Sequence, residues 1–262
     1  MQDLAPLSLT WFNSILLFGT AFLAGGLNAV AGGGSFISFP SLIFTGIAPI
    51  AANATNTTTM WVAGLASVGA YRKDLQVERR SLVILSIASG LGGAIGSIAL
   101  LSISSDIFKK LIPYLLLFAT LVFIFGEPIK IWSQTIAKKS KLEHVSIVNL
   151  VVYQLAISIY GGFFGAGAGI LMLALLTFFS TKNIHAMNAL KALLGSCING
   201  ISIILFIFAG AIVWPQAILM SIGGSLGSYI IARFARKIRP EIVRKFVSIV
   251  AISMTVYFFI YG

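Results

Sequence analysis

An uncharged stretch from Leu4 to Tyr71 constrains this chain more than any other feature of its sequence. A run of that length without Asp, Glu, Lys or Arg lacks the charged surface that a water-exposed domain needs. Of the 262 residues, 58% are hydrophobic and 10% are charged, whereas soluble domains carry about 25% charged residues. Together with a mean hydropathy of +1.00, this predicts an all-α, polytopic membrane protein surrounded by the lipid bilayer.

The apolar runs set the expected helices, and several approach the roughly 20 residues that span hydrocarbon. They cover residues 9–31, 35–50, 55–71, 81–101, 107–126, 145–164, 168–180, 188–209, 215–232 and 246–261. Two of them, 35–50 and 168–180, are too short for an untilted crossing. We therefore expect these two to be half-helices or arms of re-entrant hairpins.

Basic residues dominate the short connections between the apolar runs, and the formal net charge is +11. They gather in 72–80, 130–141 and 233–245. In a soluble protein this excess would indicate nucleic acid, but in short membrane loops it indicates topology and no nucleic-acid partner. The three loops fall on one side if each half opens with a helix pair that returns to its starting side. We therefore place the loops in the cytoplasm and both termini outside the cell inner membrane.

The two halves of the chain resemble one another in order. At an offset of 135, AGGG (31–34) matches AGAG (166–169) and DIFKKL (106–111) matches EIVRKF (241–246). GLGGAIGS (90–97) matches SIGGSLGS (221–228) at a nearly equal offset. We predict a first transmembrane repeat over 1–128, a cytoplasmic linker over 129–144 and a second repeat over 145–262. Because the halves begin on opposite sides, the repeats are inverted, as in many secondary transporters.

The matched glycine-rich segments, AGGG and AGAG, are the first candidate site. Glycine weakens a helix, and exposed backbone polar groups are not tolerated in lipid unless they line a cavity or are buried in protein. The N–H groups near Gly33, Gly34, Gly167 and Gly169 are therefore candidate ligand contacts. The alternative is close packing of helices through small residues, which also accounts well for GLGGAIGS and SIGGSLGS.

Polar residues before two full-length spans form the second candidate site. IAANATNTTT (50–59) contains Asn53, Asn56 and Thr57, and HAMNALK (185–191) contains Asn188 and Lys191. Amides, hydroxyls and one ammonium group near helix N-termini favour an anion. For the asparagines, helix capping explains the pattern as well as ligand contact does. For Lys191, the alternative to ligand contact is that its side chain snorkels to the membrane interface.

Residue types that other functions require are missing or misplaced. All seven acidic residues fall at helix ends or in loops, where they cannot form a cation site or proton relay at the membrane centre. The chain has one cysteine and two distant histidines, which do not form a metal-ligand pattern. Without a nucleophile–base pair, a metal or a cofactor motif, we expect no enzyme and no cofactor.

At these residues the sequence resembles a known family. LNAVAGGGSFISFPSLIFTGIAPIAANATN, together with GGFFGAGAGILMLALLTFF and HAMNALKALLGSCING, is similar to the TauE/SafE family of sulfite exporters. The resemblance covers nearly the whole chain and implies a membrane permease with two related halves. It also implies sulfite, thiosulfate or an organosulfonate as substrate.

The sequence as a whole predicts a secondary permease for a small sulfur-containing anion. Alternating access around a midplane site between the repeats is the expected mechanism. The alternative is a passive anion channel with re-entrant glycine-rich segments as its constriction. A homodimer stays open at this stage.

Overall fold

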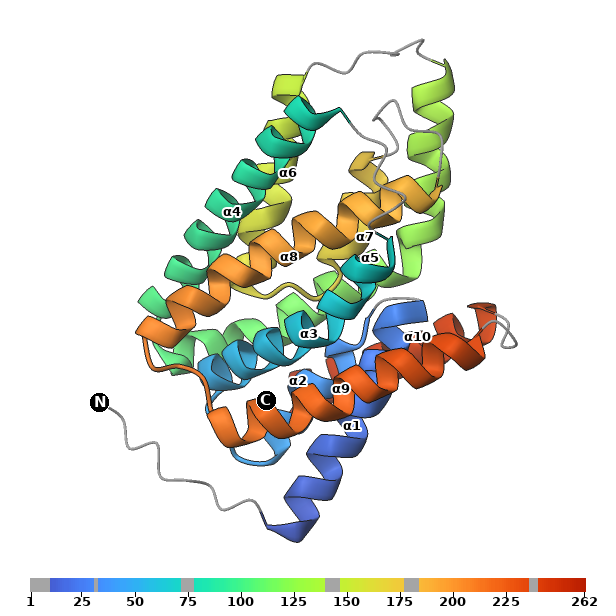
Figure 1. Cartoon of the computed structure of the whole chain (residues 1–262). Coiled ribbons are helices and arrows are strands. Elements are labelled where there is room, and N and C mark those ends of the chain that lie inside the picture. Colours follow the sequence, from blue (N-terminus) through green and yellow to red (C-terminus); the bar gives the residue numbers. More distant parts are fainter. Residues whose placement is uncertain (1–9, 31–32, 72–77, 140–146, 177–183, 236–239) are drawn as a thin grey trace.

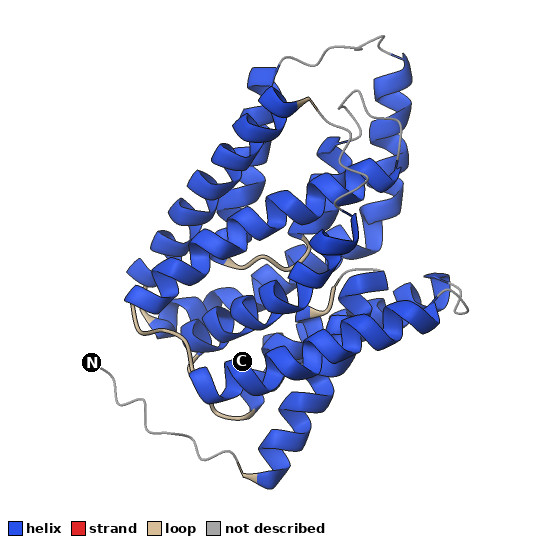
Figure 2. Cartoon of the chain, in the orientation of Figure 1, coloured by secondary structure: helices blue, strands red, loops and turns tan. Residues whose placement is uncertain are grey.

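The computed structural model describes residues 10–30, 33–71, 78–139, 147–176, 184–235 and 240–262, which form ten helices and contain no strand (Figure 2). The helices are α1 (Trp11–Val30), α2 (Ser35–Phe44), α3 (Pro49–Tyr71), α4 (Arg79–Ser102), α5 (Ser105–Lys139), α6 (Ile147–Phe163), α7 (Ala168–Leu176), α8 (Ile184–Phe208), α9 (Trp214–Ala235) and α10 (Pro240–Tyr261). The all-α prediction is therefore confirmed.

Four helical stretches are long and apolar enough to cross a membrane. They are Arg79–Ser102, Ser105–Gly126, Ala189–Phe208 and Ile242–Tyr261. Two shorter apolar helices, α2 and α6, accompany them. Outward-facing side chains agree with a lipid environment: Val83, Ile87, Leu91, Ile95 and Ile98 lie along one exposed stripe of α4. A stripe of this kind is typical of a helix that faces hydrocarbon.

The helices do not pack in the order of the chain. α4 lies against α6 and α8, whereas α9 lies against α1 and α3 (Figure 1). α4, from the first half of the sequence, therefore packs against helices of the second half. α9, from the second half, packs against helices of the first half. α3 and α8 contact one another, and so do α5 and α10.

These two helix pairs contain contacts between residues 135 positions apart. The hydroxyls of Thr120 on α5 and Thr255 on α10 are 3.0 Å apart. On the other pair, the indole Nε1 of Trp61 donates to the carbonyl of Ser196 at 3.2 Å. The separation equals the offset at which the two halves of the sequence align.

Glycines allow α4 and α9 to pack closely against helices of the other half of the chain. A Cβ at Gly92 or Gly96 of α4 would overlap α6, at Ser158 and at the carbonyl of Ile159 respectively. A Cβ at Gly227 of α9 would overlap the carbonyl of Phe22 on α1 in the same way. Close backbone packing through small residues, one of the readings of GLGGAIGS and SIGGSLGS, is therefore what these segments do.

Two helix boundaries differ from the sequence prediction. α3 begins at Pro49 rather than at residue 55, because proline suits the first helical position, where its missing N–H has no partner to lose. α5 continues to Lys139, through the start of the predicted linker, and the rest of that linker up to residue 146 lies outside the described residues. Likewise, the predicted run 168–180 is described only as far as Leu176.

Candidate functional site

The first glycine-rich break separates α1 from α2. Gly33 has a φ of 85°, which L-residues rarely adopt, whereas Ala31 and Gly32 of the same predicted break lie outside the described residues. α2 then runs back along α1: the Thr20 hydroxyl donates to Ser41 Oγ at 3.0 Å, and a Cβ at Gly34 would overlap the Ala24 carbonyl. The first break is thus the tip of a tight antiparallel pair of helices.

A polar cluster fastens this tip to α3. Asn56 Nδ2 donates to Ser35 Oγ at 3.3 Å, and Ser38 Oγ donates to Asn56 Oδ1. Asn56 is 4% exposed, so both ends of its amide are paired inside the protein. Ser38 also donates to the Gly34 carbonyl at 3.2 Å, at the break itself. All the polar groups of this cluster come from the first half of the chain.

The second break lies between α6 and α7. Gly165 and Gly167 both have a φ of 80°, and the Tyr160 hydroxyl donates to the Ala166 carbonyl at 2.6 Å. Asn53 Nδ2, from α3, donates to the Phe163 carbonyl at 3.2 Å. The second break is therefore fixed by one phenol from its own half and one amide from the other.

The structure corrects the interpretation of the asparagines as helix caps. Because α3 begins at Pro49 and α8 at Ile184, Asn53, Asn56 and Asn188 lie inside helices rather than before them. Asn53 and Asn56 instead bond to other elements, and the side chain of Asn188 lies outside the described part of the chain. The hydroxyl of Thr57 donates to the Asn53 carbonyl at 2.9 Å, one turn back along α3.

Lys191 lies beside the second break. Its side chain runs past Gly169: a Cβ at Gly169 would be 3.6 Å from Lys191 Cδ. Gly169 stands at the start of α7, whose sequence from Ala168 to Leu176, AGILMLALL, offers no polar side chain. A cation therefore passes an apolar helix at the end where the helix dipole also carries positive charge.

Both breaks meet the same turn of α5. A Cβ at Gly33 would lie 2.9 Å from Phe123 Cε2, and one at Gly167 would lie 3.5 Å from Ala119 O and from Val122 Cγ1. Residues 119–123 of α5 thus form a common wall for the two segments that the sequence matched. Of the predicted site residues, Gly33, Gly34, Asn56, Gly167, Gly169 and Lys191 gather around the two breaks, and Asn53 links α3 to the second break.

Sequence reasoning missed two residues at these breaks. Tyr160 closes the second break, and Arg244 of α10 donates through Nη2 to the carbonyls of Phe123 at 3.1 Å and Ile124 at 3.4 Å. Pro128, four residues after Ile124, has no N–H for the helical bond to that carbonyl. The proline in the sequence therefore predicts that the Ile124 carbonyl needs another hydrogen-bond donor. The neighbouring sequence does not identify Arg244 as that donor.

These features define a helical membrane protein with two buried, glycine-hinged turns. The comparisons specify the class further. The sequence profile described as "Sulfite exporter TauE/SafE" matches residues 17–258, and the chain belongs to this family.

Relatives agree with this assignment. The chain is 30% identical over 241 residues to a "Probable membrane transporter protein" of Haemophilus influenzae, and the matched region covers 92% of each chain. It is 27% identical over 262 residues to "Probable membrane transporter protein ORF9" of a Sinorhizobium species, covering 98% of this chain and 94% of that one. It is 24% identical to "Probable membrane transporter protein YfcA" of Escherichia coli K12, covering 92% and 87%. No solved structure matches the chain significantly. The protein is a membrane transporter rather than an enzyme.

Proposed function

We propose that this transporter is a secondary permease for a small sulfur-containing anion such as sulfite, thiosulfate or an organosulfonate. One observation carries the proposal: two glycine-hinged turns from different halves lie against the same turn of α5, with Lys191 beside one of them. Backbone N–H groups at the hinges and one ammonium suit an anion. The description of the family, "Sulfite exporter TauE/SafE", supports the sulfur chemistry.

The contacting residue pairs support a pair of inverted repeats. Under a pseudo-two-fold axis in the membrane plane, a residue on the axis contacts its own counterpart in the other half. Thr120 and Thr255 form such a pair, and Trp61 and Ser196 form another. The antiparallel return of α2 along α1 supports a re-entrant hairpin at the start of the first repeat. The repeats are those proposed over 1–128 and 145–262.

Alternating access is the mechanism that fits this plan. One proposed body contains α1, α2, α3, α9 and α10, and the other contains α4 to α8. They meet mainly along α3 with α8 and along α5 with α10. An anion held where both breaks face α5 would be exposed to opposite sides as the bodies rock. The proposed substrate contacts are Asn53, Thr57, Asn188 and Lys191, with the hinge glycines. Asn56, the other expected contact, is proposed to hold α2 against α3 instead, because both ends of its amide are paired. The basic loops lie in the cytoplasm and both termini outside the inner membrane in this proposal.

Uptake by purified protein in proteoliposomes tests the proposal. We expect saturable flux of sulfite, thiosulfate or an organosulfonate that exceeds the flux of sulfate. Conductance that rises without saturation would instead favour the channel alternative. Exclusive transport of a cation or a neutral solute would overturn the anion assignment. Labelling of a cysteine introduced as Gly262→Cys from outside only would support the orientation, whereas labelling from the cytoplasm contradicts it.

A further inference from the structure

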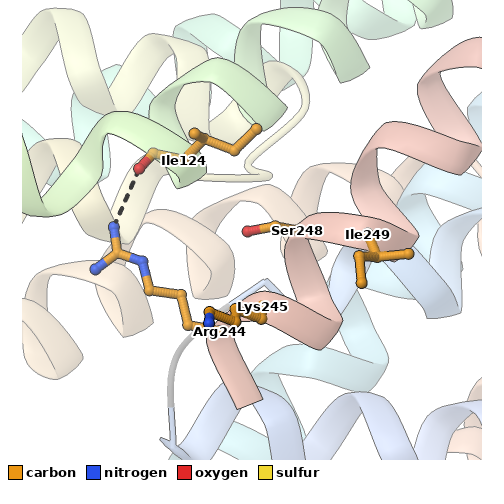
Figure 3. Close-up of a pocket in the computed structure, with 5 residues that line it drawn as sticks. All are labelled: Ile124, Arg244, Lys245, Ser248 and Ile249. Atoms are coloured by element: carbon orange, nitrogen blue, oxygen red, sulfur yellow. Dashed lines mark hydrogen bonds between the residues drawn. The ribbon is translucent and has the colours of Figure 1, made fainter. Parts of the chain in front are cut away.

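A cavity lies beside the first two turns of α10. It has a volume of about 440 Å³ and is lined by Ile124, Arg244, Lys245, Ser248 and Ile249 (Figure 3). The membrane-spanning part of α10 begins at Ile242, so the cavity lies at one end of that span rather than at its centre. The cavity is a different site from the two glycine-rich breaks, because none of the residues that line it is a glycine of those breaks.

Arg244 presents a fixed cation at the wall of this cavity. Its guanidinium reaches across to α5 and donates to the carbonyls of Phe123 and Ile124, as Figure 3 shows for Ile124. The guanidinium carbon also lies 6.0 Å from the centroid of the Phe123 ring, within the range of a cation–π contact. Three contacts with one short segment hold this side chain in place at the wall of the cavity.

The other lining residues combine a second cation with apolar surface. Lys245 is exposed, and Ser248 follows it three residues later on the same face of α10. Ile249 is 64% exposed on the outer surface of the helix, next to the polar groups. A small free anion would use only the cations and the hydroxyl. A ligand that joins an anionic head to an apolar chain would use every lining residue.

We propose that this cavity binds an anionic phospholipid, with the phosphodiester at Arg244, Lys245 and Ser248 and an acyl chain along Ile249. Cations, a hydroxyl donor and an adjoining apolar surface at the end of a span match a lipid headgroup site. The orientation proposed above assigns it to the cytoplasmic leaflet, but the binding itself does not depend on the transported substrate.

The matching segment of the first half supplies a control. Lys110 stands where Lys245 stands in the aligned motifs DIFKKL and EIVRKF, and it is also exposed. At the same offset, Lys109 matches Arg244 and is exposed, and Pro113 matches Ser248 and has no hydroxyl. Lys110→Gln therefore removes the same charge from a membrane protein of the same composition without touching the proposed headgroup contacts.

The test is native mass spectrometry of the whole protein released from detergent with dioleoylphosphatidylglycerol or dioleoylphosphatidylcholine. We expect preferential retention of phosphatidylglycerol and a loss of about fivefold in its retention on Lys245→Gln. Ser248→Ala should lower retention less, and Lys110→Gln should leave it unchanged. Thermal unfolding of each variant checks that the fold is intact.

Three results would each overturn this site. Equal retention of both lipids, or equal losses from Lys245→Gln and Lys110→Gln, would show nonspecific attraction to the net positive charge. Displacement of phosphatidylglycerol by low millimolar inorganic phosphate would assign the cavity to a free oxyanion instead of a lipid. Persistence of the bound lipid under that competition supports the phospholipid.

Discussion

The two glycine-rich breaks have matching positions in the sequence but are filled differently. At the first break, Ser35 and Ser38 of α2 pair with the buried amide of Asn56. At an offset of 135 these positions become Ile170, Leu173 and Lys191. The neutral polar cluster of one break is thus replaced at the other by two apolar side chains and a cation.

The two breaks therefore differ in the kind of polar group that lies beside them. The amide of Asn56 is consumed by internal hydrogen bonds, so its main effect is to fix α2 against α3. Lys191 is partly exposed and passes an apolar helix at Gly169. A cation in such surroundings is costly for stability, and costly intramembrane charges are usually functional. We therefore expect the second break to contribute more to substrate binding and the first more to stability.

The largest effect should come from locking the α5–α10 pair against which both breaks are placed. The hydroxyls of Thr120 and Thr255 are 3.0 Å apart, which brings these side chains within reach of a disulfide. Oxidation of Thr120→Cys with Thr255→Cys, in a Cys197→Ser background, should reduce anion flux more than tenfold. Flux should return after reduction. The measurement is uptake into proteoliposomes before and after oxidant and reductant.

Each single cysteine variant serves as the control for this experiment, because it experiences the same oxidant without a partner. If the oxidised double variant transports at the unlocked rate, then α5 and α10 do not move relative to one another during transport. In that case the proposed rocking of the two bodies around the shared turn of α5 is wrong.

A stability difference between the hinge glycines tests the comparison directly. Alanine at Gly33 or Gly167 must adopt a positive φ, which costs about 1–2 kcal/mol. At Gly33 the new Cβ would also lie 2.8 Å from Val247 and 2.9 Å from Phe123, and overpacking adds about 1–3 kcal/mol. Gly167→Ala meets only ordinary contacts from 3.5 Å. Thermal unfolding in detergent should therefore show a larger loss for Gly33→Ala.

Gly64 provides the matched control for the glycine variants. It lies inside α3, and a Cβ there would meet nothing within 4 Å. Gly64→Ala should be neutral or more stable by about 1 kcal/mol because alanine is the better helix former. Equal destabilisation by Gly33→Ala and Gly167→Ala would show that the two breaks do not differ in their packing.

Replacing the cation should separate binding from stability. Lys191→Gln removes the charge but keeps an amide, so the half-saturating anion concentration should rise about tenfold. Asn56→Ala should instead lower the free energy of unfolding by about 1–3 kcal/mol, since it removes a hydrogen-bond partner from the buried Ser38 hydroxyl and from the half-buried Ser35 hydroxyl. An unchanged half-saturating concentration in Lys191→Gln would return Lys191 to the snorkelling interpretation.

The sequence predicted the long helices well because hydrophobic runs determine where spans are stable in lipid. It failed where the partner is distant in the chain. Asn53 and Asn56 looked like caps because their segment stands at the start of the apolar run 55–71. Pro49 instead starts the helix earlier, and the amides bond to Phe163 and to α2. Arg244 looked like a topology signal, and only tertiary packing reveals its bonds to α5.

The smallest effect should come from Asn53, whose side chain joins α3 to the second break. Asn53→Ala removes a single hydrogen bond to the Phe163 carbonyl, worth about 1 kcal/mol. Because that carbonyl ends α6 two residues before Gly165, the break should become less well positioned and the maximal flux should fall two- to threefold. Asn53→Asp is the informative companion: it keeps the size of the side chain but loses the N–H donor and adds a negative charge. If the second break holds an anion, Asn53→Asp must lower flux more than Asn53→Ala. Equal flux in the two variants would place the anion away from this end of α6 and leave Lys191 without its proposed neighbour.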